Sequence, residues 1–147
     1  MASFRRRGFL AALILGLCAA CTEKPAEPPP SPVNSLEIVD LKAGEGASIA
    51  AGQQAVVQYT GWLYEASAPD KKGKEFDSSR RSGEPFRFAV GAGQVIKGWD
   101  QGVVGMKVGE SRRLIIPPDL AYGDGGAGGV IPPGATLVFD VELVGIE

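Results

Sequence analysis

Short alternations of apolar and polar residues, separated by glycine, proline and aspartate, run along the chain from Ser35 onward. In residues 55–64, Val57, Tyr59 and Leu63 fall on one face of an extended segment, and polar residues fall on the other. This period of two is typical of a half-buried strand. The same pattern predicts strands in residues 85–90, 111–116 and 135–146. We therefore expect several antiparallel strands, each with one face toward a core.

One segment departs from this period. Val95, Trp99 and Val103 recur at every fourth residue, which predicts a short amphipathic helix over residues 95–103. A sheet and a helix that each have one apolar face bury both faces most compactly by packing together. The sequence thus predicts an α+β fold, a curved antiparallel sheet wrapped around one short α-helix, with Trp99 pressed into the concave face.

Residues 1–20 have the organisation of a signal peptide. Arginines at positions 5–7 precede an apolar run over residues 9–17, and small residues follow that run. The run is too short to span a bilayer, which requires about 20 apolar residues. Residues 6–10 (RRGFL) resemble a twin-arginine export signal, but a chance basic region explains them equally well, so the export route stays open.

Residues 17–21 (LCAAC) resemble a bacterial lipobox, in which Cys21 becomes the lipidated first residue of the mature chain. Ordinary cleavage after Ala20, with an unmodified cysteine, is the alternative. The proline-rich residues 21–34 favour extended polyproline II, and at ~3.1 Å per residue they could hold a domain up to about 40 Å from its anchor. Lipidation predicts an exported, membrane-anchored lipoprotein that faces the periplasm or the cell exterior.

Composition limits the kinds of chemistry that the chain after the signal peptide can carry out. A length of 147 residues fits one domain, which we place at residues 35–147. Without the signal arginines, 12 basic and 17 acidic residues leave a net charge of −5, and no basic patch indicates nucleic acid binding. Histidine is absent and both cysteines lie within the first 21 residues, which excludes imidazole bases, His-ligated metals and thiol nucleophiles from the domain.

Six short motifs follow one another in the domain: residues 57–61 (VQYTG), 76–79 (FDSS), 85–88 (PFRF), 93–99 (GQVIKGW), 121–123 (AYG) and 130–143 (VIPPGATLVFDVEL). In this order they resemble the FKBP family of peptidyl-prolyl cis-trans isomerases, and the resemblance covers essentially all of residues 35–147. It implies isomerase activity on X-Pro bonds without a cofactor or a metal.

This activity suits a domain that lacks nucleophiles. Rotation about an X-Pro bond breaks no covalent bond, but it crosses a barrier of ~18–20 kcal/mol because the twisted amide loses its resonance. The twisted amide is also less polar than the planar one. A dry apolar cavity therefore binds the twisted form preferentially and lowers the barrier.

The resemblance assigns ten residues to the site. Trp99 is the implied floor under the proline ring, the Tyr122 hydroxyl donates to a substrate carbonyl, and the Ile96 N–H binds a second carbonyl. Asp77 orients neighbouring groups, and Ile131 touches the residue before the proline. The full set is Tyr59, Phe76, Asp77, Phe86, Val95, Ile96, Trp99, Tyr122, Ile131 and Phe139. By pattern alone, Val95, Trp99 and Phe139 would be core residues, and Tyr122 could instead anchor a loop.

Two segments depart from the family pattern. Residues 65–74 are longer than the corresponding segment of compact members, and their polarity predicts a surface loop. The glycine-rich residues 123–129 lack the aromatic residue or histidine that some members carry there. Neither departure removes a residue of the implied site.

The implied substrates are proline-containing peptides and unfolded exported proteins, and the implied inhibitor is a macrolide. A lipid anchor would add contact with the membrane. Residues 22–34 are too short and too rich in proline to supply a dimerising helical arm, so we expect a monomer rather than an adhesion protein. The other function class is a binding module that recognises proline peptides without turnover.

Overall fold

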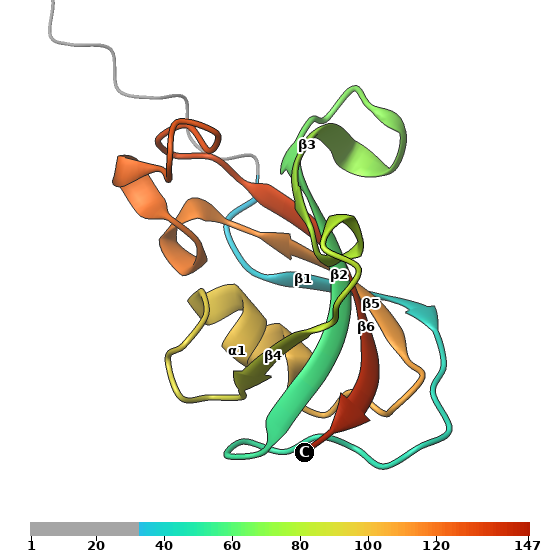
Figure 1. Ribbon diagram of the computed structural model, residues 1–147. Coiled ribbons are helices and arrows are strands. Elements are labelled where there is room, and N and C mark those ends of the chain that lie inside the picture. Colours follow the sequence, from blue (N-terminus) through green and yellow to red (C-terminus); the bar gives the residue numbers. More distant parts are fainter. Residues whose placement is uncertain (1–32) are drawn as a thin grey trace, which may run out of the picture.

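The computed structural model describes residues 33–147 (Figure 1). The predicted signal peptide, Cys21 and nearly all of the predicted tether lie outside the described residues. The strands are β1 (Glu37–Lys42), β2 (Gln54–Tyr64), β3 (Lys72–Ser78), β4 (Phe86–Ala89), β5 (Ser111–Ile116) and β6 (Leu137–Ile146). The helices are α1 (Lys97–Val103) and four short 3-10 turns, η1 (Pro69–Lys71), η2 (Ser79–Arg81), η3 (Pro118–Leu120) and η4 (Gly123–Gly125).

All six strands belong to one antiparallel sheet with the order β1-β5-β6-β2-β3, and β4 pairs with β2. β2 pairs with β6 over almost its whole length, and its other edge is shared between β3 and β4. α1 lies beside one face of this bent sheet (Figure 1). The predicted α+β fold, a curved antiparallel sheet with a single α-helix, is confirmed.

Side-chain alternation divides the sheet into an inner and an outer face. On β5, Leu114 and Ile116 are fully buried on the inner face and join Trp99 of α1 in the main core. Ile115, which lies between them in sequence, packs instead in a smaller cluster that contains Val33. The two clusters lie on opposite sides of the strands because successive side chains alternate. The predicted strand over residues 111–116, with one face toward the core, is therefore confirmed.

Two glycines allow α1 to lie very close to β5. A Cβ atom on Gly98 would stand 2.5 Å from Cγ2 of Ile116, and one on Gly102 would stand 2.7 Å from Cδ2 of Leu114. Real Cβ atoms do not approach other heavy atoms this closely. The two glycines are one helical turn apart and both face the sheet. This contact sets how deeply the helix enters the concave side.

The outer face carries a cluster of charges centred on Asp140 of β6. Arg113 of β5 donates to this carboxylate from Nε at 2.8 Å and from a second nitrogen at 3.2 Å, and Lys72 of β3 donates at 2.7 Å. Burial by itself would raise the pKa of Asp140, but the hydrogen bonds from Arg113 and Lys72 outweigh it and hold the pKa below its ordinary 3.8. The cluster joins three strands of the sheet.

The prediction of a surface loop over residues 65–74 is partly wrong. Residues from Lys72 onward belong to β3, where Lys72 pairs with Tyr64 of β2. The ammonium group of Lys72 also lies 4.1 Å from the ring centroid of Trp62. These contacts, together with the ion pair to Asp140, come from residues that are distant in the sequence or on a neighbouring strand. The polarity of residues 65–74 alone does not indicate these contacts.

The predicted helix over residues 95–103 begins later than expected. α1 starts at Lys97, and Ile96 before it has an extended ψ of 149°. Val95 and Ile96 therefore belong to the segment that leads into the helix, although both pack against the main core. Helical periodicity identified the correct face, but it did not define the first turn.

Substituting Gly98→Ala tests the close approach of α1 to the sheet. The added methyl group would collide with buried Ile116, and overpacking of this kind costs about 1–3 kcal/mol, more than the roughly 1 kcal/mol that alanine gains by helix propensity. We expect a lower urea midpoint. Gly125→Ala is the control, because nothing lies within 4 Å of its added Cβ. Equal midpoints for the two variants would contradict this packing.

Substituting Asp140→Asn tests the charge cluster. Because the folded pKa of Asp140 lies below 3.8, the carboxylate stabilises the fold above that pH and loses its contribution as pH falls through the folded pKa. We expect the free energy of unfolding at pH 7 to fall by about 2 kcal/mol, and the difference from wild type to shrink below pH 4. The exposed Asp119→Asn should be neutral; a pH-independent difference for Asp140→Asn would refute the assignment.

Candidate active site

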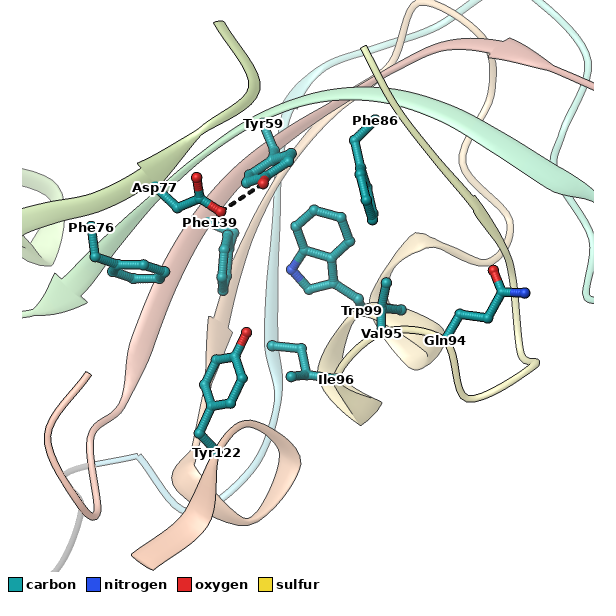
Figure 2. Close-up of a pocket in the computed structure, with 10 residues that line it drawn as sticks. All are labelled: Tyr59, Phe76, Asp77, Phe86, Gln94, Val95, Ile96, Trp99, Tyr122 and Phe139. Carbon is teal, nitrogen blue, oxygen red and sulfur yellow. Dashed lines mark hydrogen bonds between the residues drawn. The ribbon is translucent and has the colours of Figure 1, made fainter. Parts of the chain in front are cut away.

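A cavity of about 260 Å³ opens between the concave face of the sheet, the segment that leads into α1, and the segment between η3 and η4 (Figure 2). Most of its walls are aromatic or aliphatic. The lining residues are Tyr59, Phe76, Asp77, Phe86, Gln94, Val95, Ile96, Trp99, Tyr122 and Phe139. These residues belong to strands, a helix and loops that are far apart in the sequence. The cavity therefore exists only in the folded domain.

The indole of Trp99 is the centre of the aromatic cluster. Its ring centroid lies 4.9 Å from that of Tyr59 and 5.2 Å from that of Phe139, with interplanar angles of 81° and 88°. Phe86 and Phe88 of β4 contact the same indole at 6.0 and 5.5 Å. Edge-to-face pairs of this kind contribute about 0.5–1.5 kcal/mol each beyond the area they bury. The indole is only 4% exposed, and its orientation is set from several sides.

Tyr59 and Asp77 form the main polar pair of the cavity wall. The Tyr59 hydroxyl donates to Oδ2 of Asp77 at 2.7 Å (Figure 2). The backbone N–H of Ser78 donates to Oδ1 at 2.8 Å. Burial and this hydrogen bond raise the pKa of Tyr59 far above its ordinary value, so the phenol keeps its proton. Both oxygens of Asp77 therefore have fixed donors, and the carboxylate orients the phenol.

Three donors belong to lining residues and have no hydrogen-bond partner among residues 33–147. The Tyr122 hydroxyl points into it from the segment between η3 and η4 (Figure 2), and burial together with the charge of Asp77 raises the pKa of Tyr122. The buried Nε1 of Trp99 has no hydrogen-bond partner in this part of the chain. The backbone N–H of Ile96 likewise has no backbone acceptor there. The exposed Tyr122 hydroxyl can donate to a carbonyl oxygen of a bound peptide.

The structure brings nine of the ten predicted site residues to the cavity. The exception is Ile131, which is 5% exposed and packs in the main core rather than lining the cavity. Its backbone closes a tight turn, since Ile131 and Ala127 exchange two hydrogen bonds of 3.0 Å. Any side chain at Gly126, whose φ is +62°, would collide with the Ile131 carbonyl. This turn directs the isoleucine inward.

One lining residue was not in the predicted set. Gln94 lies at the edge of the cavity, and its side-chain oxygen accepts a hydrogen bond from the backbone N–H of Ala89 at 3.0 Å. This bond ties the segment before α1 to the end of β4. Its position beside Val95, inside the motif at residues 93–99, could have indicated from the sequence that Gln94 lies at the site.

The arrangement favours binding and distortion rather than covalent chemistry. Asp77 is the one ionisable carboxylate in the lining, and its partner is a tyrosine rather than a histidine, serine or cysteine nucleophile. Among residues 33–147, no group of three potential metal ligands comes together. An apolar floor with a few hydrogen-bond donors at its edge suits a peptide segment with a proline ring.

Comparisons with known proteins agree on one family. The family model described as FKBP-type peptidyl-prolyl cis-trans isomerase matches residues 45–144. The chain is 53% identical over 109 residues to FK506-binding protein 1 of Dictyostelium discoideum, a match that covers 74% of this chain and 95% of that protein. It is 49% identical over 112 residues to an FK506-binding protein of Neisseria meningitidis serogroup A, covering 76% and 96%.

A solved structure extends the similarity to three dimensions. The crystal structure of AtFKBP13 matches with a TM-score of 0.66 and 41% identity, covering 76% of this chain and 93% of that one. The matched length corresponds to the described domain rather than to the N-terminal residues. The chain therefore belongs to the FKBP-type peptidyl-prolyl cis-trans isomerases, a family of isomerases.

Proposed function

We propose that this domain accelerates rotation about X-Pro bonds of exported proteins by binding the twisted amide in the aromatic cavity around Trp99. The observation that carries the proposal is the concave aromatic surface itself, with the Tyr122 hydroxyl beside it and no serine, cysteine or histidine in its lining. Rotation needs only a surface that fits the twisted bond better than water does.

The physical basis is differential solvation. A planar amide is strongly polar, and it loses more hydration than a twisted one when it leaves water. An apolar floor such as the Trp99 indole therefore stabilises the twisted form relative to the planar form. Each ~1.4 kcal/mol of this difference speeds rotation about tenfold. The aromatic walls supply this effect without any proton transfer.

Each polar group has a role in this proposal. The proline ring rests on the indole of Trp99, while the Tyr122 hydroxyl and the Ile96 N–H donate to carbonyls on either side of the rotating bond. The Asp77 carboxylate holds the Tyr59 phenol in place and does not transfer a proton; its fixed donors support this role. These contacts orient the peptide so that rotation occurs over the floor.

The same cavity is the proposed site for a macrolide inhibitor. Relatives at 49–53% identity are named FK506-binding proteins, and nine of the residues implied by the family resemblance line this cavity. A macrolide that occupies the cavity would compete with the proline peptide. Competition between the two would place both ligands in one site.

The proposed setting is outside the cytoplasm, at a membrane. The support is the sequence of residues 1–34, with its arginines, apolar run and Cys21, followed by a proline-rich tether. No helix within residues 33–147 is long and apolar enough to cross a bilayer. Attachment through a lipid on Cys21 would leave the domain as a monomer beside the membrane, where unfolded exported chains are its substrates.

The variant Tyr122→Phe tests the isomerase mechanism. Loss of one hydrogen bond to the substrate should lower kcat/KM on a Leu-Pro peptide about three- to tenfold in a protease-coupled assay. The urea midpoint should not change, because the side chain is 42% exposed. Tyr64→Phe is the matched control, since Tyr64 packs with the smaller cluster on the outer face. Binding of the peptide by the wild type without any acceleration would instead indicate a binding module.

The variant Cys21→Ala tests the anchor. Without the thiol that receives the lipid, the protein should move from the membrane to the soluble fraction of cells that export it. Cys18→Ala is the control and should stay with the membrane, because this cysteine lies within the predicted signal peptide. A Cys21→Ala protein that still sediments with membranes would disprove lipidation at this position.

A further inference from the structure

Along one of its edges, β2 has a gap in its strand pairing at Gln58 and Tyr59. Along one edge, β4 pairs with residues up to Val57 and β3 pairs with residues from Thr60 onward. In Figure 1, β3 lies beside the upper half of β2 and β4 beside the lower half. Tyr59 falls between the stretches of β2 that pair with β4 and with β3, and its side chain forms part of the cavity wall. Its backbone groups on this edge therefore need partners other than the backbone of a neighbouring strand.

A serine hydroxyl fills this gap. Oγ of Ser79, the first residue of η2, accepts a hydrogen bond from the backbone N–H of Tyr59 at 2.8 Å. The same oxygen lies 3.3 Å from the Tyr59 carbonyl, which also accepts a hydrogen bond from Oγ of Ser78 at 3.2 Å. Ser79 is only 6% exposed, so water has little access to this position. Without the hydroxyl, the Tyr59 N–H would be left without an acceptor at the edge of the cavity.

A second residue sets the direction of this hydroxyl. Oγ of Ser79 donates to Oε1 of Gln58 at 2.6 Å. Because its proton is directed to Gln58, the lone pairs of the oxygen remain for the Tyr59 N–H. The hydroxyl therefore acts as an oriented acceptor in place of a strand carbonyl.

Tyr59 is thus held at both ends by residues two apart in the chain. Ser79 holds the backbone, and Asp77 accepts the phenol proton at 2.7 Å. Between these points the ring packs on Trp99 with centroids 4.9 Å apart. A shift of the Tyr59 backbone would move the phenol relative to the floor of the cavity. Sites that orient a reacting group tolerate only small displacements of this kind.

We propose that Ser79 is a positioning residue for the isomerase site: its buried hydroxyl replaces the missing strand at Tyr59 and so fixes the tyrosine wall against Trp99. The inference rests on the proposed isomerase function and adds a residue that does not line the cavity. It acts through Tyr59 and makes no contact with the proline peptide.

The decisive experiment compares Ser79→Thr with Ser79→Val. The two side chains have nearly the same shape, and only threonine keeps a hydroxyl, so any packing cost is shared. We expect kcat/KM on a Leu-Pro peptide to be at least fivefold higher for Ser79→Thr, in line with the loss expected when a supporting hydrogen bond is removed. Ser79→Ala should behave like Ser79→Val. Equal kcat/KM for the threonine and valine variants would overturn the proposal.

A second readout does not depend on activity. In Ser79→Val, the amide hydrogen of Tyr59 should exchange with solvent at least tenfold faster than in Ser79→Thr, while that of Val57 stays unchanged. Ser82→Ala is the control, because its hydroxyl bonds the Ser79 carbonyl at 2.8 Å without contacting Tyr59; it should leave both readouts unchanged. An unaltered Tyr59 amide in Ser79→Val would refute the role even if the wild type had no isomerase activity.

Discussion

The contact between the Trp99 indole and the rings of the sheet is the interaction on which the rest of the domain depends. Tyr59 of β2, Phe88 of β4 and Phe139 of β6 each meet the indole edge-on or tilted, at 4.9–5.5 Å. One side chain of a seven-residue helix thereby connects three strands. The same indole lines the cavity, so the residue that holds the helix on the sheet is also the surface available to a ligand.

Because Trp99 has both roles, the two faces of the sheet differ in their side chains. The inner face is apolar and carries the cavity, and a close helix–sheet contact at Gly98 keeps the indole deep. The charges that tie strands together lie on the outer face, around Asp140. Keeping fixed ion pairs away from the cavity preserves a low-polarity floor, which is what discrimination between a twisted and a planar amide requires.

Polar groups within the cavity are restrained rather than reactive. Asp77 is committed to Tyr59 and to the backbone of Ser78, and Ser79 holds the other end of Tyr59. The carboxylate and the serine hydroxyl therefore position an aromatic wall and leave the unpaired donors, such as Tyr122, for a ligand. An isomerase can be built in this way because the reaction needs orientation and an apolar surface but no bond-breaking group.

The sequence by itself determined the strand periodicity and the helical face of Trp99, because local alternation carries this information. Nine of the cavity residues were implied by the resemblance of its short motifs to a family, and not by alternation. Only the tertiary structure decided that Lys72 lies in a strand, that Ile131 turns into the core, and that Gln94 reaches the cavity. Each of these outcomes depends on a partner on another element: Asp140, the turn at Ala127 or the N–H of Ala89. A pattern along one segment does not specify which distant group will meet it in space.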